Sequence, residues 1–280
     1  MRDDVPFDET ELIASDGLPL RAWSRSPVFE PEGCIAFVHG LGEYSARYAR
    51  LAEFWVRHGF VVAGFDLRGH GKSGGPRGHT PSYDQMLDDI ATFLAYATST
   101  PWRLPVTLYG HSMGGGLVLN YAIRRQPPVS SVVASAPYLR LAFQPPAWKL
   151  RLAHLFRNLA PAYSQPAALE LAALTRDVAE IERYANDPLV HDRISVSLFN
   201  GAHTAGEEAI ARAGELRVPV LLIHGTADRI TDAAGSEAFV HNSRGRATLK
   251  RCEGFFHEIH NDPGWEDVEA FVLSWIRSVR

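Results

Sequence analysis

Apolar runs that would be buried on both faces alternate with amphipathic segments along most of the chain. The runs fall at residues 34–38, 60–65, 106–109, 129–136, 218–223 and 247–252. Because such runs are typical of parallel strands covered by helices, each predicts a buried strand. Apolar residues between the runs keep helical spacing, as at 48–56, 83–97 and 268–279. The alternation therefore predicts a mainly parallel sheet with helices on both faces.

A hairpin is predicted before the first of these strands. Strand-like segments at 12–14 and 18–23 flank Asp16 and Gly17. An Asp-Gly pair suits the positive φ angles of a tight turn. With this hairpin the chain holds eight strand-like segments, so we expect an eight-stranded sheet.

Residues 137–217 break the alternation. Prolines are frequent there, and the apolar residues between them include Trp148 and Phe156. Helices are expected, and no strand-like run is present. We expect a helical cap laid over the carboxyl edge of the sheet, with the core formed by residues 1–136 and 218–280. The alternative is that the segment forms an extra helical layer of the core.

The composition narrows the class of protein. The 280 residues are 46% hydrophobic and 21% charged, as in ordinary globular proteins. A net charge of −4 without a long basic run argues against nucleic acid as a partner. The acidic start lacks the apolar stretch of a secretory signal, and no apolar run reaches the roughly 18 residues that span a bilayer. Cys34 and Cys252 lie in apolar runs, so we expect buried free thiols and a cytoplasmic location.

The strand predicted at 106–109 ends in Gly110-His111-Ser112-Met113-Gly114, after which a helix is expected. A sharp strand-to-helix turn needs strained backbone angles and tolerates no bulk beside its central residue. The glycines on either side of Ser112 meet that need. Ser112 is therefore the predicted nucleophile, with its hydroxyl above the sheet.

A serine hydroxyl needs a histidine to take its proton and a carboxylate to orient that histidine. On the elbow folds these partners follow the serine in the order acid, then histidine, each on a loop after a strand. Asp228 follows the strand at 218–223, and His257 follows the strand at 247–252. We predict that they complete a triad. Asp232 is a competing acid, but it or Thr231 better suits the cap of a helix.

Acyl transfer also needs hydrogen-bond donors for the developing oxyanion. One predicted donor is the backbone N–H of Met113, at the start of the elbow helix. The other is the N–H of Leu41, in the glycine-containing loop after the strand at 34–38.

Five motifs together resemble the monoacylglycerol lipases and related lysophospholipases of the α/β-hydrolase fold. They are HGLGEYSARY at 39–48, DLRGHGKS at 66–73, GHSMGG at 110–115, DPLV at 187–190 and GTADR at 225–229. The resemblance implies ester hydrolysis on a single-chain lipid beneath a mobile apolar cap. It also implies that Glu43, Arg47 and His260 bind the glycerol end or organise the oxyanion loop. Tyr184 is expected at the polar end of the pocket.

Three other motifs do not predict cofactor or metal sites. Residues 69–74 fit Gly-x-Gly-x-x-Gly, but proline and glycine follow where a dinucleotide-binding fold needs a helix. A phosphate-binding loop would need glycine at Asp66. His257 and His260 are three positions apart, whereas the zinc motif places its histidines four apart. We predict no cofactor and no metal.

The predicted function is hydrolysis of monoacylglycerol to glycerol and fatty acid. A lysophospholipase and a general short-chain carboxylesterase use the same chemistry and remain alternatives. A receptor that binds a small ligand on the same fold is a third alternative. The apolar and basic segment 148–159 suggests peripheral membrane contact through the cap, and the alternative is that it packs on the cap itself. The natural acyl chain and the oligomeric state stay open.

Overall fold

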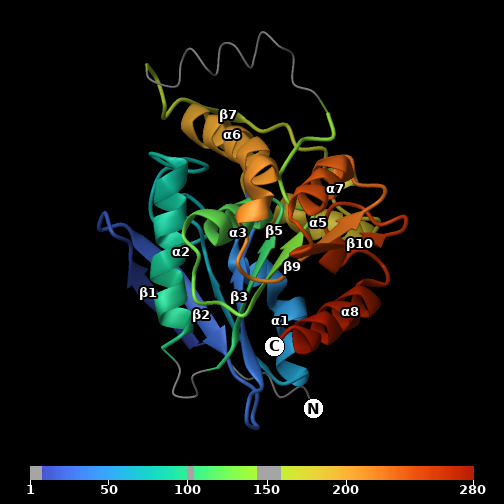
Figure 1. The fold of residues 1–280 in the computed structure, drawn as a ribbon. Helices are drawn as coiled ribbons and strands as arrows, with labels where there is room; N and C mark the ends of the chain where they lie inside the picture. Colours follow the sequence, from blue (N-terminus) through green and yellow to red (C-terminus); the bar gives the residue numbers. More distant parts are fainter. Residues whose placement is uncertain (1–7, 100–103, 144–158) are drawn as a thin grey trace.

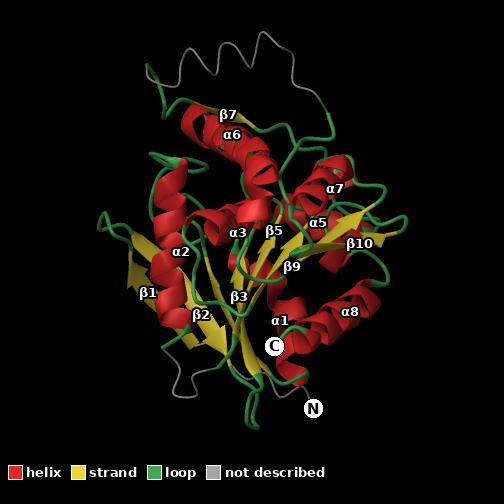
Figure 2. Ribbon diagram, in the orientation of Figure 1, coloured by secondary structure: helices red, strands yellow, loops and turns green. Residues whose placement is uncertain are grey.

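The computed structural model describes residues 8–99, 104–143 and 159–280. A twisted sheet of eight strands runs through the middle of this part of the chain, and helices cover both of its faces (Figures 1 and 2). The strand order is β1-β2-β4-β3-β5-β6-β9-β10. The prediction of an eight-stranded, mainly parallel sheet with helices on both faces is confirmed.

The hairpin predicted at the start forms the antiparallel edge of this sheet. It consists of β1 (Asp8–Ile13) and β2 (Pro19–Arg25), and β2 also pairs antiparallel with β4. The other strands are parallel: β3 (Gly33–Val38), β4 (Phe60–Phe65), β5 (Val106–His111), β6 (Ser131–Ser135), β9 (Val220–Gly225) and β10 (Ala247–Cys252). Cys34 and Cys252 are buried free thiols, as predicted.

Alternate residues of the central strands serve two separate cores, because successive side chains point to opposite faces. Ile35 and Phe37 pack with α1 (Ala49–Arg57) and α8 (Trp265–Ser278), which lie together on one face (Figure 1). Ala36 and Val38 belong to the core on the other face. The helices on that face are α2 (Tyr83–Ala97), α3 (Met113–Arg124) and α7 (Ala233–Asn242). Short 3-10 turns, η1 (Ser45–Tyr48) and η4 (Ile259–Asn261), precede α1 and α8.

The segment between β6 and β9 crosses the carboxyl edge of the sheet. Its described elements are β7 (Ser164–Pro166), η2 (Leu171–Ala173), α5 (Val178–Asn186), β8 (Arg193–Ser195), α6 (Val196–Arg212) and η3 (Ala213–Glu215). Buried residues of α6 share a core cluster with α3, so this helix packs the segment against the helices that cover the sheet.

The expectation that this segment holds no strands was wrong. β7 and β8 pair antiparallel as a separate two-stranded ribbon. Each strand has three residues, so the apolar alternation that marks a strand in a sequence cannot develop in either of them. The predicted apolar segment at 148–159 lies outside the described residues except for Leu159. Among the residues that the structure describes, no helix is both long and apolar enough to cross a bilayer.

The end of β3 and the start of α3 approach each other more closely than a side chain would allow. A Cβ atom at Gly114 would lie 2.3 Å from the carbonyl oxygen of Val38 and 2.4 Å from that of His39. Gly114 therefore sets the distance between the serine turn and the loop that follows β3.

Gly114→Ala should force these two backbone segments apart. We expect a loss of about 1–3 kcal/mol in the free energy of unfolding, the usual cost of overpacking a core. Differential scanning calorimetry measures the effect. Gly235→Ala is the control, because the nearest atoms to its Cβ would be Leu139 Cβ at 3.3 Å and Arg140 N at 3.4 Å, which are much farther than the contacts at Gly114. Equal thermal midpoints for the two variants would contradict the account.

Candidate active site

Ser112 occupies a strained turn between β5 and α3. Its φ of 53° and ψ of −117° lie outside the regions that L-residues favour. Backbone hydrogen bonds hold the turn, since the Ser112 N–H donates to Ser135 O at 2.9 Å and the Ser112 carbonyl accepts from Tyr138 N–H at 2.8 Å. A Cβ at Gly110 would lie 2.3 Å from the carbonyl oxygen of Gly114, so the turn excludes a side chain there. The predicted elbow geometry is present.

The structure brings His257 and Asp228 to Ser112 from the ends of two other strands. Ser112 Oγ lies 2.9 Å from His257 Nε2, and His257 Nδ1 lies 2.8 Å from Asp228 Oδ2. Both partners are buried, with 4% and 0% of their side chains exposed. In a neutral ring Nδ1 donates to the carboxylate, which leaves Nε2 to accept the serine proton. The three groups thus form a continuous line of hydrogen bonds.

Several donors surround the Asp228 carboxylate. The N–H groups of Ile230 and Thr231 donate to Oδ1, at 2.7 and 3.0 Å. Thr231 Oγ1 lies 2.9 Å from Oδ2, and His224 Nε2 lies 3.3 Å from the same oxygen. Asp232 instead caps α7 by accepting from Ala234 N–H, as the sequence predicts.

The surroundings shift the pKa values of this pair in opposite directions. Burial raises the pKa of Asp228, but His257 and His224 outweigh it and hold that pKa well below its usual range. Burial lowers the pKa of His257, but the Asp228 carboxylate outweighs it and the pKa is raised. Asp228 is therefore ionised, and the imidazolium that proton transfer from serine would create is stabilised.

The N–H groups of Leu41 and Met113 are available to bind an oxyanion. Both residues line the same cavity as Ser112. In the described part of the chain neither N–H has an acceptor. Met113 is the first residue of α3, where helical N–H groups are free of partners and the helix dipole favours negative charge.

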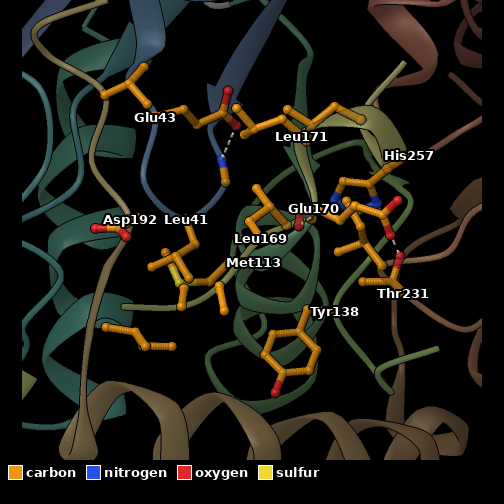
Figure 3. A pocket seen from close by; sticks show the side chains of 18 of the residues that line it. Leu41, Glu43, Met113, Tyr138, Leu169, Glu170, Leu171, Asp192, Thr231 and His257 are labelled. Atoms are coloured by element: carbon orange, nitrogen blue, oxygen red, sulfur yellow. Dashed lines mark hydrogen bonds between the residues drawn. The ribbon is translucent and has the colours of Figure 1, made fainter. Parts of the chain in front are cut away.

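A cavity of about 840 Å³ opens above Ser112. Figure 3 shows Leu41 and Met113 toward one side of it and His257 with Thr231 on the other. Most of the remaining lining is aliphatic or aromatic, from Tyr138, Phe143, Leu171, Leu174, Val190, Ile194, Phe199 and Ile230. This volume and lining suit a ligand with a long apolar part.

Acidic side chains mark a polar end of the cavity. Glu43 and Glu258 line it, and Arg47 lies between them at 2.6 and 3.1 Å. Glu43 also accepts from the Gly40 N–H at 2.6 Å (Figure 3). The Arg47 guanidinium stacks over the ring of Tyr184, 4.5 Å from its centroid. Burial raises the pKa of Glu43, whereas at Glu258 burial is outweighed by Arg47 and His260, which lower the pKa to about 2. The one guanidinium therefore already has an ionised carboxylate partner.

Two residues expected to bind substrate lie behind the cavity wall. Neither Arg47 nor His260 belongs to the described residues that line the cavity. His260 stacks on Tyr48, and its ring centroid lies 4.9 Å from that of His111. Burial lowers the pKa of His260 to about 3, so its ring is neutral. Glu43 and Tyr184 do line the cavity, as expected.

Sequence reasoning missed three residues of this site. Thr231 and His224 contact Asp228, and Glu258 pairs with Arg47. The first two flank the predicted acid, and Glu258 directly follows the predicted base, so adjacency to the triad was a usable signal. The pairing of Glu258 with Arg47 spans 211 positions and carries no local signal.

The chain is similar to several known proteins. Residues 29–264 match the family model described as serine aminopeptidase, S33. A Dictyostelium discoideum protein described as an uncharacterized abhydrolase domain-containing protein is 33% identical over 96% of this chain, which spans only 29% of that protein. A monoacylglycerol lipase of Mycolicibacterium smegmatis is 31% identical, with 90% of this chain and 91% of that protein covered.

A solved structure is also similar. The crystal structure of the Paleococcus ferrophilus monoacylglycerol lipase is 36% identical, with a TM-score of 0.85. The match covers 93% of this chain and 99% of that one.

The raised pKa of His257 predicts the pH profile. A base must be neutral to accept the serine proton, so kcat/KM for an activated ester should fall as the pH drops through a midpoint above 6.5, the ordinary histidine value. Asp228→Asn should lower this midpoint and reduce kcat by about 10⁴-fold.

Asp232→Asn is the matched control for this profile. It removes a nearby carboxylate that caps α7 but does not contact His257, so it should leave the midpoint unchanged. A wild-type midpoint well below 6.5, or the same shift in both variants, would contradict the assignment.

Proposed function

Because this chain belongs to the S33 serine aminopeptidase family of α/β-hydrolases, whose members similar to it include monoacylglycerol lipases, we propose that it hydrolyses monoacylglycerols to glycerol and fatty acid. One observation carries the proposal. The line from Asp228 through His257 to Ser112 ends in a cavity that is large and mostly apolar but acidic at one end. An acyl chain fits the apolar part, and a neutral polyol fits the other.

In the first half of the reaction Ser112 Oγ attacks the ester carbonyl. His257 Nε2 takes the serine proton, and Asp228 orients the ring and stabilises its positive charge. The carbonyl oxygen becomes negative as the tetrahedral intermediate forms, and the N–H groups of Leu41 and Met113 bind it. The intermediate collapses when His257 gives the proton to the departing glycerol oxygen, which leaves the acyl group on Ser112.

In the second half a water molecule replaces the glycerol. His257 takes a proton from the water, which attacks the acyl carbonyl, and the same two N–H groups bind the second oxyanion. The proton then returns to Ser112 Oγ, and the fatty acid leaves. The serine, the histidine and the aspartate end the cycle in their starting protonation states.

The charge at the polar end favours a neutral head group over a phosphodiester. Arg47 is the cation nearest to Glu43 and Glu258, and it is already shared between them. A phosphate brought to this end would be repelled by the ionised Glu258, whose charge already pairs with Arg47. For the same reason a substrate ammonium, as in an aminopeptidase, would have to compete with Arg47 for both carboxylates.

Of the residues around the triad, some would bind the glycerol and others would hold the oxyanion loop in place. Glu43 and Tyr184 line the cavity and would contact the glycerol. Glu43 also accepts from Gly40 N–H, so with Arg47 it would hold the loop that carries the Leu41 donor. His260 would support the same group from behind by stacking on Tyr48.

Residues 137–217 would act as the cap, with residues 1–136 and 218–280 as the core. The segment supports this division by supplying much of the apolar lining, including Leu169, Leu174 and Phe199. Within it, α6 would be the fixed part, since it packs on α3.

Peripheral membrane contact through the cap is a further part of the proposal. Phe143, Leu159 and Tyr163 are 52%, 74% and 64% exposed, and Phe143 also lines the cavity. Exposed apolar side chains on the cap, of which Phe143 reaches the cavity, would let a lipid substrate pass from a bilayer without crossing water.

Ser112→Ala should abolish hydrolysis of monoacylglycerols and labelling by a fluorophosphonate, because the hydroxyl that forms the acyl-enzyme is removed. Labelled protein is counted by in-gel fluorescence and hydrolysis by release of glycerol. Ser130→Ala, a serine without a described side-chain hydrogen bond, is the control and should behave as wild type. A Ser112→Ala protein that still reacts with the probe would contradict the assignment of Ser112 as the nucleophile.

A substrate panel tests the choice of ester. We expect kcat/KM for a long-chain monoacylglycerol to exceed that for the matching lysophosphatidylcholine by at least about tenfold, or about 1.4 kcal/mol. A short-chain p-nitrophenyl ester and an aminoacyl anilide complete the panel. Preference for the lysophospholipid, for short esters or for the anilide would each replace the proposal with the corresponding activity. Tight binding of esters without product would indicate a receptor.

A further inference from the structure

His39 lies at the start of the loop that carries the Leu41 donor, and the mechanism above gives it no role. It follows β3 directly and its side chain is completely buried. It does not line the cavity, so it cannot touch a substrate there. Its two ring nitrogens, however, both have backbone partners.

The partners of His39 fix which nitrogen carries the proton. Nε2 lies 2.9 Å from the backbone N–H of Leu67, which can only donate, so Nε2 must be the unprotonated acceptor. In a neutral ring the proton then resides on Nδ1, which lies 2.8 Å from the carbonyl oxygen of Gly40 and donates to it. Burial lowers the pKa of His39 to about 4, which keeps the ring neutral at physiological pH.

The bond from His39 acts on the peptide unit that bears the oxyanion donor. The Gly40 carbonyl and the Leu41 N–H belong to one planar trans peptide, so they point in opposite directions. A donor that holds the carbonyl on one side therefore directs the N–H to the other. At the preceding peptide Glu43 Oε1 accepts from Gly40 N–H at 2.6 Å, so both ends of Gly40 are held.

The close packing around Gly40 makes this orientation matter. A Cβ at Gly40 would lie 3.2 Å from Ser112 Cβ, so the peptide is adjacent to the nucleophile. A rotated peptide would present its carbonyl oxygen to the developing oxyanion, and two negative oxygens would repel each other. The N–H is needed only when the oxyanion exists, so its loss would slow the chemical step without weakening ground-state binding.

We propose that His39 is a positioning residue for the oxyanion hole, which holds the Gly40–Leu41 peptide with its N–H toward Ser112 by donating from Nδ1 to Gly40 O. The proposal rests on the acyl-transfer function proposed above. The proposed role depends on the contact of Nδ1 with Gly40 O and not on the contact of Nε2 with Leu67 N–H. Substitution by asparagine or by glutamine can separate the two contacts.

The test compares His39→Gln with His39→Asn. The amide nitrogen of asparagine stands near the position of Nδ1, so His39→Asn keeps a donor for Gly40 O and loses the acceptor for Leu67 N–H. The amide of glutamine reaches the position of Nε2, so His39→Gln keeps an acceptor for Leu67 and loses the donor for Gly40. Each variant removes one of the two bonds.

We expect kcat for an activated ester to fall about 10- to 100-fold in His39→Gln, with KM within about twofold of wild type. His39→Asn should keep kcat within about threefold of wild type, even if its thermal midpoint is lower. The Ki of a trifluoromethyl ketone, whose serine adduct carries an oxyanion, should rise in His39→Gln by the factor lost in kcat/KM. Equal losses in both variants, or a wild-type kcat in His39→Gln, would overturn the proposal.

A measurement on the wild-type protein does not depend on whether the variants fold. In ¹⁵N spectra of the histidine rings at neutral pH, His39 should carry its proton on Nδ1, with Nε2 bare. A proton on Nε2 would overturn the proposal. The outcome is separable from the proposed function, because a wild type that cleaves activated esters but no monoacylglycerol would refute the substrate and leave the His39 test intact.

Discussion

The strained backbone at Ser112 is the constraint on which the rest of the site depends. A φ of 53° at a non-glycine residue persists only where its surroundings compel it. Here β5 and α3 compel it, and the absence of side chains at Gly110 and Gly114 lets two backbone segments meet. The same close approach sets the elbow beside the loop after β3. The close contact between the end of β3 and the start of α3 therefore positions both Ser112 and the two oxyanion donors.

Charge behind the cavity is arranged so that each buried carboxylate has several donors. Asp228 accepts from two backbone N–H groups and lies against two histidines, which keeps it ionised although its side chain is fully buried. Glu43 and Glu258 share Arg47, and a buried charge that lost this partner would be costly. Reactivity and stability are thus linked. The buried charges that orient His257 and hold the oxyanion loop need these same partners to remain stable in the interior.

The sequence predicted the sheet, the elbow and the members of the triad because each leaves a local mark. Buried strands appear as apolar runs, Ser112 has a glycine on either side at the required spacing, and Asp228 and His257 each follow such a run in the expected order. The pairing of Glu258 with Arg47 and the contact of His39 with Gly40 left no comparable mark. These partners lie elsewhere in the chain, or are backbone groups whose orientation only the folded loop decides. The ribbon of β7 and β8 was missed because each strand has only three residues, too few to show the alternation of apolar and polar side chains that marks a strand.

The central claim is that Ser112 carries the acyl group between the two halves of the reaction. The direct measurement is the intact mass of the wild-type protein, quenched in acid during turnover of a monoacylglycerol, followed by mapping of the modified peptide. The account predicts one acyl group per chain, attached to Ser112. Rapid turnover with no acylated protein, or an acyl group attached to another residue, would contradict it.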